Sequence, residues 1–192
     1  MTEIKKKSPV SILDLTFTAM GAALIAVCSW VTIPLPAVPI TLQTFAVFAV
    51  LGILGGARGT ASIAVYVALG AMGVPVFSGF KGGIGALLGV TGGYIVGFIF
   101  SAGFFRLITA LKNNSVPSRI IGMIGGLAVC YAFGTAWFVA AYSNNVEPIG
   151  VGAALMKCVV PFLIPDAVKL TLAFAVSAAL AGRLPGLRKA RS

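Results

Sequence analysis

The sequence predicts an all-α membrane protein, folded as a single domain over residues 1–192 with six transmembrane helices. Hydrophobic residues make up 59% of the chain and charged residues only 9%, whereas a soluble domain usually carries about 25% charged residues. Ten-residue segments in which apolar and polar residues alternate, which are typical of a membrane β-barrel, are missing. Long runs without Asp, Glu, Lys or Arg provide room for helices of about 20 residues; these runs are 15–57, 59–80, 82–105 and 120–146.

Prolines and charges delimit the first three helices. The first is predicted over 13–32, because the proline-rich break at 34–39 cannot continue a helix. The second is predicted over 41–55, with the hydroxyl of its first residue, a threonine, as a cap. The third covers 59–72 and leads to a glycine-rich loop over 79–85.

Polar turns delimit the remaining helices. The fourth helix is predicted over 92–111, and the turn 113–118 contains the Asn, Ser and Pro residues that favour a break. The fifth helix covers 119–142. An outer loop follows, with a short helix around 152–160, and the last helix covers 166–181.

The positive charge of the chain predicts its orientation. The formal net charge is +10, and most basic residues lie in the tails 1–10 and 183–192 or in short breaks between apolar runs. That pattern is the positive-inside signal, so we expect both termini to be cytoplasmic. Lys81 and Lys157 are then outside, and Lys169 lies within the last helix. No basic patch is interleaved with aromatic residues, which argues against nucleic-acid binding.

The sequence argues against an enzyme. It has no histidine and only four carboxylates, so general acid–base chemistry has few candidates. Cys28, Cys130 and Cys158 are widely spaced and odd in number, which predicts apolar residues in helices rather than disulfides or metal ligands. A P-loop for ATP and a convincing internal repeat are both missing. We therefore expect a protein that binds a small solute without an energy source of its own; a pore and a membrane enzyme remain as alternatives.

Two ionisable residues in the last helix are the strongest candidates for solute binding. Asp166 and Lys169 are three residues apart and therefore share a helix face. Charged residues within a span usually face the bundle interior or a wet cavity, because each costs about 2.5–3.5 kcal/mol at a helix centre. Asp166 would accept N–H donors from the solute and Lys169 would donate to an oxygen. The alternative is an ordinary salt bridge at a helix end near the interface.

The loop 76–94 provides a second group of candidates. Its glycines expose backbone N–H groups to a ligand, and Lys81 is its sole charge and could hold a carboxylate. Tyr94 and Gln43 could also contact the solute. Each of these features also has another interpretation. The loop could be only a flexible connection, Tyr94 could belong to an aromatic belt at the membrane interface, and Gln43 could form a hydrogen bond between helices.

Several segments in order along the chain resemble the BioY family, the biotin-specific substrate-binding (S) components of energy-coupling factor transporters. Each segment alone is modest, but together they are specific and cover nearly the whole chain. The segments are 39–45 (PITLQTF), 66–70 (YVALG), 73–77 (GVPVF), 82–83 (GG), 91–94 (TGGY) and 165–169 (PDAVK).

The resemblance implies a six-helix bundle in the bacterial cytoplasmic membrane, with biotin bound near the outer surface. It implies that the residues matching Asp166, Lys169 and Tyr94 contact biotin, as do residues of the glycine-rich loop. The full set of candidate contacts is Asp166, Lys169, Tyr94, Lys81, Gly82, Gly83, Gln43 and Phe77. Relatives often have no charge at position 81 and commonly have proline at Val90. Which of Lys81 and Lys169 holds the biotin carboxylate is left open.

The resemblance also implies partners. Ala19 and Ala23 resemble the small-residue motif that helix 1 of S components presents to a transmembrane coupling protein. Two cytoplasmic ATPase subunits complete such a transporter, so ATP is used only by partners and no cofactor or metal is expected here. Biotin is then the transported ligand; the alternative is an S component for a different small vitamin.

Overall fold

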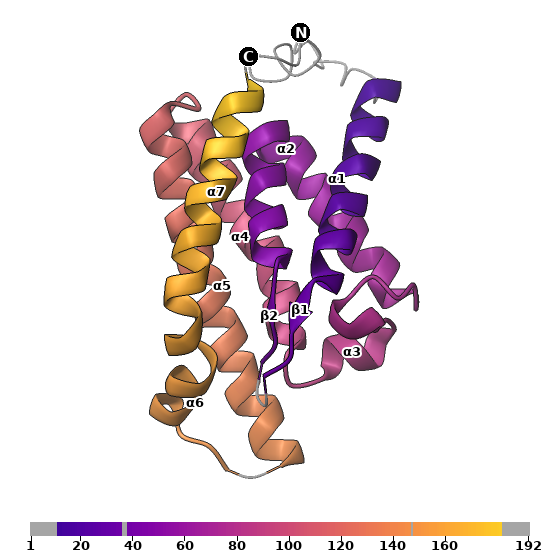
Figure 1. Ribbon diagram of the computed structural model, residues 1–192, viewed down its shortest axis with the longest axis vertical. Helices are drawn as coiled ribbons and strands as arrows, with labels where there is room; N and C mark the ends of the chain where they lie inside the picture. The colour runs from indigo at the N-terminus through magenta and orange to yellow at the C-terminus, as the bar shows by residue number, and fades with distance from the viewer. Residues whose placement is uncertain (1–10, 36–37, 147, 182–192) are drawn as a thin grey trace, which may run out of the picture.

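The computed structural model describes residues 11–35, 38–146 and 148–181. Helices predominate, and the longest of them run side by side along the long axis of the molecule (Figure 1). The elements in chain order are α1 (Ile12–Trp30), β1 (Thr32–Ile33), β2 (Ile40–Thr41), α2 (Gln43–Ala71), the 3-10 turn η1 (Ser78–Phe80), α3 (Ile84–Leu88), α4 (Gly92–Leu111), α5 (Val116–Asn145), α6 (Val151–Cys158), the 3-10 turn η2 (Val160–Phe162) and α7 (Leu163–Ala181).

Helix α2 forms the centre of the bundle. It packs against α1, α4 and α7, and α4 packs in turn along α5. Phe48 and Leu51 of α2 are fully buried and belong to the same apolar cluster as Phe105 of α4 and Met123 of α5. A continuous core of this kind fixes the positions of the helix ends that surround the candidate site.

The structure confirms the prediction of a mostly helical chain, and several of its helices could cross a membrane. Within the described residues, five helical segments are long and apolar enough to cross a membrane, with mean hydropathies of 1.5–1.8. These are Ile12–Trp30, Gln43–Ala71, Gly92–Leu111, Val116–Asn144 and Val151–Leu180. Six spans are predicted from the sequence because the segment of α2 is predicted there as two helices. The count of six spans stays a prediction.

A break at Gly55 divides α2. Gly55 has φ +81° and ψ 171°, a conformation that is essentially restricted to glycine. A Cβ added at Gly59 would lie 2.9 Å from Cα of Leu51, although residues eight apart on a straight helix are about 12 Å apart. The chain therefore folds back at Gly55, close to the boundary predicted between the second and third helices.

We expect Gly55→Ala to lower the free energy of unfolding by about 1–3 kcal/mol, the usual cost of a glycine-only backbone conformation. A Cβ here would meet no atom within 4 Å, so the cost is conformational. Gly103→Ala is the matched control: its site in α4 is equally open and has ordinary helical backbone, so alanine should stabilise by up to about 1 kcal/mol. Thermal unfolding of both variants checks this, and equal shifts would contradict the assigned strain.

The short elements gather at one end of the bundle. Strands β1 and β2 pair antiparallel, with Thr32 opposite Thr41, and Figure 1 shows them with α3 and α6 in the lower part of the molecule. Thr41 thus lies in a strand rather than in the second helix, yet its hydroxyl accepts the N–H of Gln43 at 3.2 Å. The predicted short helix in the last outer loop is confirmed as α6, whereas α3 lies in a segment that the sequence predicts as loop.

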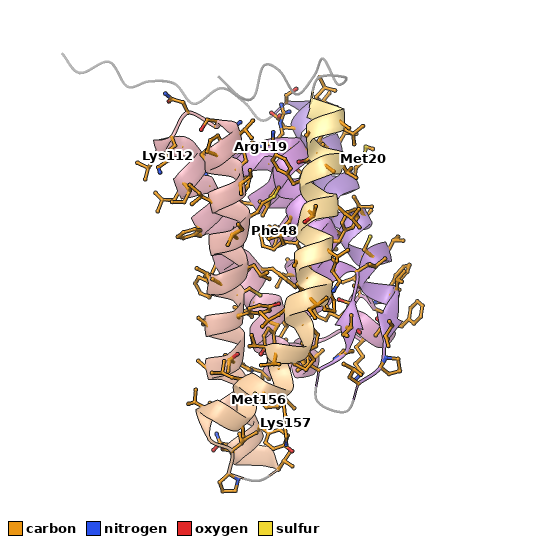
Figure 2. All side chains as sticks on the ribbon, turned by 60° about the vertical axis from the view of Figure 1, so that its left-hand side comes forward. Met20, Phe48, Lys112, Arg119, Met156 and Lys157 are labelled. Atoms are coloured by element: carbon orange, nitrogen blue, oxygen red, sulfur yellow. The ribbon has the colours of Figure 1, made fainter. Side chains whose placement is uncertain are left out.

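The opposite end carries the predicted inner charges. Helix α1 begins and α7 ends there, at the top of Figure 1, and Ser11 and Asp14 form a capping box at the start of α1. Asp14 is also ion-paired with Arg58. Figure 2 shows Lys112 and Arg119 towards this end and Lys157 at the other. The arrangement agrees with the expected charge asymmetry; the tails 1–10 and 182–192 lie outside the described residues.

Candidate ligand-binding site

A cavity, partly open to solvent, lies between the ends of several elements. Its walls are mainly apolar with a few polar groups, as is usual for small-molecule sites. Strand β2 and the starts of α2, α4 and α7 contribute to the walls, together with α5 and the end of α6. The apolar lining includes Ile95, Phe98, Leu127 and Phe162, and the polar lining includes Thr41, Gln43, Thr44, Ser78, Thr91, Tyr94, Tyr131, Asp166 and Lys169.

The predicted charged pair lies in this cavity. Lys169 Nζ donates to Asp166 Oδ1 at 2.8 Å, and the two residues are only 7% and 2% exposed. Asp166 lies in the first turn of α7, where the positive end of the helix dipole favours a carboxylate. Both groups are therefore buried in the cavity wall, and their charges are partly compensated by each other.

The phenol of Tyr131 holds the second oxygen of the carboxylate. Its hydroxyl donates to Asp166 Oδ2 at 2.6 Å, across from α5 to α7. Each carboxylate oxygen thus has one protein donor and keeps capacity to accept a second hydrogen bond. Lys169 uses one of its three N–H groups on Asp166, so the ammonium can also donate to a solute oxygen.

Two further predicted residues line the same cavity. Tyr94 lies in the first turn of α4, and its hydroxyl is 3.2 Å from Thr135 Oγ1 of α5. Gln43 lies at the start of α2 and donates from Nε2 to the hydroxyl of Tyr66 at 2.8 Å. The hydrogen bond between helix segments that the sequence offered as an alternative for Gln43 is therefore present, and the residue still faces the cavity.

The remaining candidates lie beside the cavity. Phe77, Lys81 and Gly82 line a second, more open cavity, which shares lining residues such as Ser78 and Thr91 with the first. Phe77 is only 2% exposed and packs edge-on against Tyr66. Gly83 lines neither cavity, and its N–H donates to Gly70 O at 2.6 Å.

Comparison with known proteins shows to which family this chain belongs. The model of the BioY family matches residues 3–186. This chain belongs to the BioY family. A BioY relative from Thermotoga maritima, named "Biotin transporter BioY", is 42% identical over 79% of this chain and 85% of its own length. A Pyrococcus horikoshii relative, named "Probable biotin transporter BioY", is 35% identical over 88% of this chain and 96% of its own.

A solved structure agrees with the BioY fold. The crystal structure of the S-component for biotin from an ECF-type ABC transporter has a TM-score of 0.75 to this chain. The two are 27% identical, and the match covers 98% of this chain and 95% of the other.

Sequence reasoning missed part of this BioY-family site. It assigned no role to Tyr131, although a phenol in the middle of an uncharged span is a signal, because buried Tyr hydroxyls usually find a partner. Cys130 and Cys158 also line the cavity and are free thiols. The apolar wall residues carry no signal of their own, because they resemble every other apolar residue in the helices.

Proposed function

We propose that this protein is the biotin-binding subunit of a vitamin uptake transporter, which captures biotin at the outer face of the bacterial cytoplasmic membrane. The observation that carries the proposal is the buried pair Asp166–Lys169 in an apolar cavity of a BioY-family member. The relatives described above are named as biotin transporters, so the family is one of transporters rather than enzymes.

The cavity groups are complementary to the ureido ring of biotin. This ring has two N–H donors and one carbonyl acceptor. Asp166 accepts an N–H, and Lys169 donates to the carbonyl with an N–H group that the ion pair does not use. The apolar residues Phe98 and Phe162 cover the thiolane ring and the valeryl chain. Burial strengthens these polar contacts, because unpaired polar groups are costly away from water.

The second cavity is suited to the carboxylate end of biotin. It adjoins the first cavity, with which it shares lining residues, and Lys81 is its cationic residue. We expect Lys81→Met to weaken biotin binding about 3-fold and to leave binding of biotin methyl ester unchanged, since an exposed ion pair contributes at most about 1 kcal/mol. Competition titrations with acid and ester check this. Equal losses for both compounds would show that Lys81 does not hold the carboxylate.

Transport requires partners, and the exposed face of α1 supports docking of one of them. Ala19 and Ala23 are both exposed on α1, and small residues let a partner helix approach closely in a membrane. In this proposal α1 docks on a transmembrane coupling protein, two ATPases provide energy, six spans cross the membrane and both termini are cytoplasmic.

The test is equilibrium binding of labelled biotin to the purified chain, with unlabelled thiamine and riboflavin as competitors. The proposal predicts saturable binding that only biotin displaces. No saturable binding of labelled biotin, together with saturable binding of labelled thiamine or riboflavin, would support an S component of different specificity and contradict the proposal.

We expect Tyr131→Phe to weaken biotin binding about 10- to 100-fold, because a hydrogen bond to a charged group contributes about 1.5–3 kcal/mol. The ring remains, but Asp166 Oδ2 loses its protein donor. Tyr142→Phe is the control, since it removes a phenol of the same helix that does not contact Asp166. Titration of both variants with labelled biotin measures the difference; a Tyr131→Phe affinity equal to that of Tyr142→Phe would contradict a role for this hydroxyl.

A further inference from the structure

The glycine-rich loop carries an exposed apolar surface that solute binding does not use. Residues 75–89, here called the outer segment, include only two polar side chains, Ser78 and Lys81. Both of them line the second cavity. The most exposed apolar side chains of the outer segment are Phe80 (65%), Ile84 (64%) and Leu88 (62%).

Helix α3 gives the outer segment two different faces, and neither of them is polar. Gly85 and Ala86 line the second cavity, and Leu87 packs against the apolar core. Ile84 and Leu88 are one turn apart, so they share the face that is left exposed. A helix at a water-exposed surface normally has polar residues on its outer face, whereas an entirely apolar helix is typical of a protein interior or a membrane.

The two tryptophans of the chain hold the two ends of the outer segment. Trp30, the last residue of α1, donates from Nε1 to Pro75 O at 3.0 Å, and its ring stacks on Phe80 with 5.1 Å between the centroids. Trp137 of α5 donates from Nε1 to Gly89 O at 3.1 Å. The outer segment therefore lies at the level that these tryptophans occupy along the bundle.

Helix lengths indicate where that level is in a membrane. Both α1 and α5 start at the end of the bundle that carries the inner charges. At about 1.5 Å per residue, Trp30 lies about 27 Å from the start of α1 and Trp137 about 32 Å from the start of α5. The hydrocarbon core is about 30 Å thick, and Trp is enriched at its boundaries. Helix α5 continues beyond this level, and Figure 1 shows its end well below α3.

We propose that the outer segment lies in the interface of the lipid bilayer and inserts Phe80, Ile84 and Leu88 among the lipid chains. The apolar surface of the candidate spans leads directly to it: the exposed residues Val27 and Val65 line a groove between α1 and α2 that ends at the start of the outer segment. Lipid contact then supports one wall of the second cavity from behind. The proposal goes beyond solute capture and does not depend on which solute is bound.

Spin labelling of the purified chain in lipid nanodiscs tests the proposal. The three native cysteines are replaced by alanine, and the label is attached to Leu88→Cys. Asn144→Cys, exposed near the end of α5, is the water control, and Leu172→Cys, exposed on α7, is the lipid control. Oxygen concentrates among lipid chains and a nickel chelate stays in water. We expect the ratio of their collision rates at Leu88→Cys to exceed that at Asn144→Cys at least about 3-fold, because interfacial apolar faces are buried about 5–10 Å deep.

A ratio at Leu88→Cys equal to that at Asn144→Cys would place the outer segment in water and overturn the proposal. Low collision rates with both reagents would show that protein covers the segment, which also overturns it. If the cysteine variants do not fold, the wild type provides a second measurement. Its tryptophan fluorescence should be quenched about 2-fold more by lipids with a nitroxide near the headgroup than by lipids with one at the chain end. The opposite order would contradict the proposed level.

Discussion

Asp166→Asn is expected to weaken biotin binding about 100-fold or more while the protein remains folded. Loss of one partner of a buried, hydrogen-bonded charge pair costs about 2–5 kcal/mol in binding. The substitution preserves shape but removes the negative charge, so the ammonium of Lys169, only 7% exposed, loses its counter-ion at 2.8 Å. The new amide N–H₂ also faces either Lys169 or the hydroxyl of Tyr131, both of which are donors.

Asp14→Asn is the matched control for this variant. Asp14 is also ion-paired, but its partner is Arg58, and it caps the start of α1 at the opposite end of the bundle. Its loss should leave biotin affinity within about 2-fold, because neither residue of this pair lines the cavity and distant sites act nearly independently. Titrations of the two variants with labelled biotin give the comparison. If Asp166→Asn binds biotin with wild-type affinity, Asp166 is not part of the binding site.

Arg119→Met is expected to have the opposite effect: a large loss of stability with little change in biotin affinity. Arg119 is 6% exposed and donates from Nη2 to Gly52 O at 3.0 Å and Ser177 Oγ at 2.9 Å. It thus joins α5 to α2 and α7. Gly52 lies in the last turn before the break at Gly55, where helix carbonyls require partners outside the helix.

The expected loss in the free energy of unfolding is about 3 kcal/mol, because hydrogen bonds from a charged donor contribute about 1.5–3 kcal/mol each and are not additive. Lys112→Met is the control, since Lys112 is exposed and lies towards the same end of the bundle (Figure 2). Thermal unfolding of the purified variants measures stability, and biotin titration measures binding. A melting temperature of Arg119→Met equal to that of Lys112→Met would contradict the structural role.

The sequence predicts the centre of the site because charge is rare in these helices. Asp166 and Lys169 stand out in an apolar stretch, and their spacing places them on one face without knowledge of the fold. The partner of Asp166 on α5 is different. Tyr131 is 35 residues away in the sequence, and only the packing of α5 beside α7 brings the phenol to the carboxylate.

The same distinction applies to the fold. Helix positions follow from uncharged runs of the right length, and the boundaries differ from the structure by a few residues. The reversal at Gly55 depends on the backbone conformation of that one residue. Several other glycines lie nearby in the sequence, and the sequence alone does not distinguish Gly55 from them. The pairing of Thr32 with Thr41 and the short helix α3 depend on tertiary contacts, which a pattern of apolar residues does not encode.

The most direct test is an experimental structure of this protein with biotin bound. We predict that the ureido ring lies in the cavity beside α7, with an N–H within hydrogen-bond distance of the Asp166 carboxylate and the carbonyl oxygen near Lys169 Nζ. The valeryl carboxylate should extend towards the second cavity. Biotin bound outside this cavity, or with its ureido ring away from Asp166 and Lys169, would contradict the proposed site.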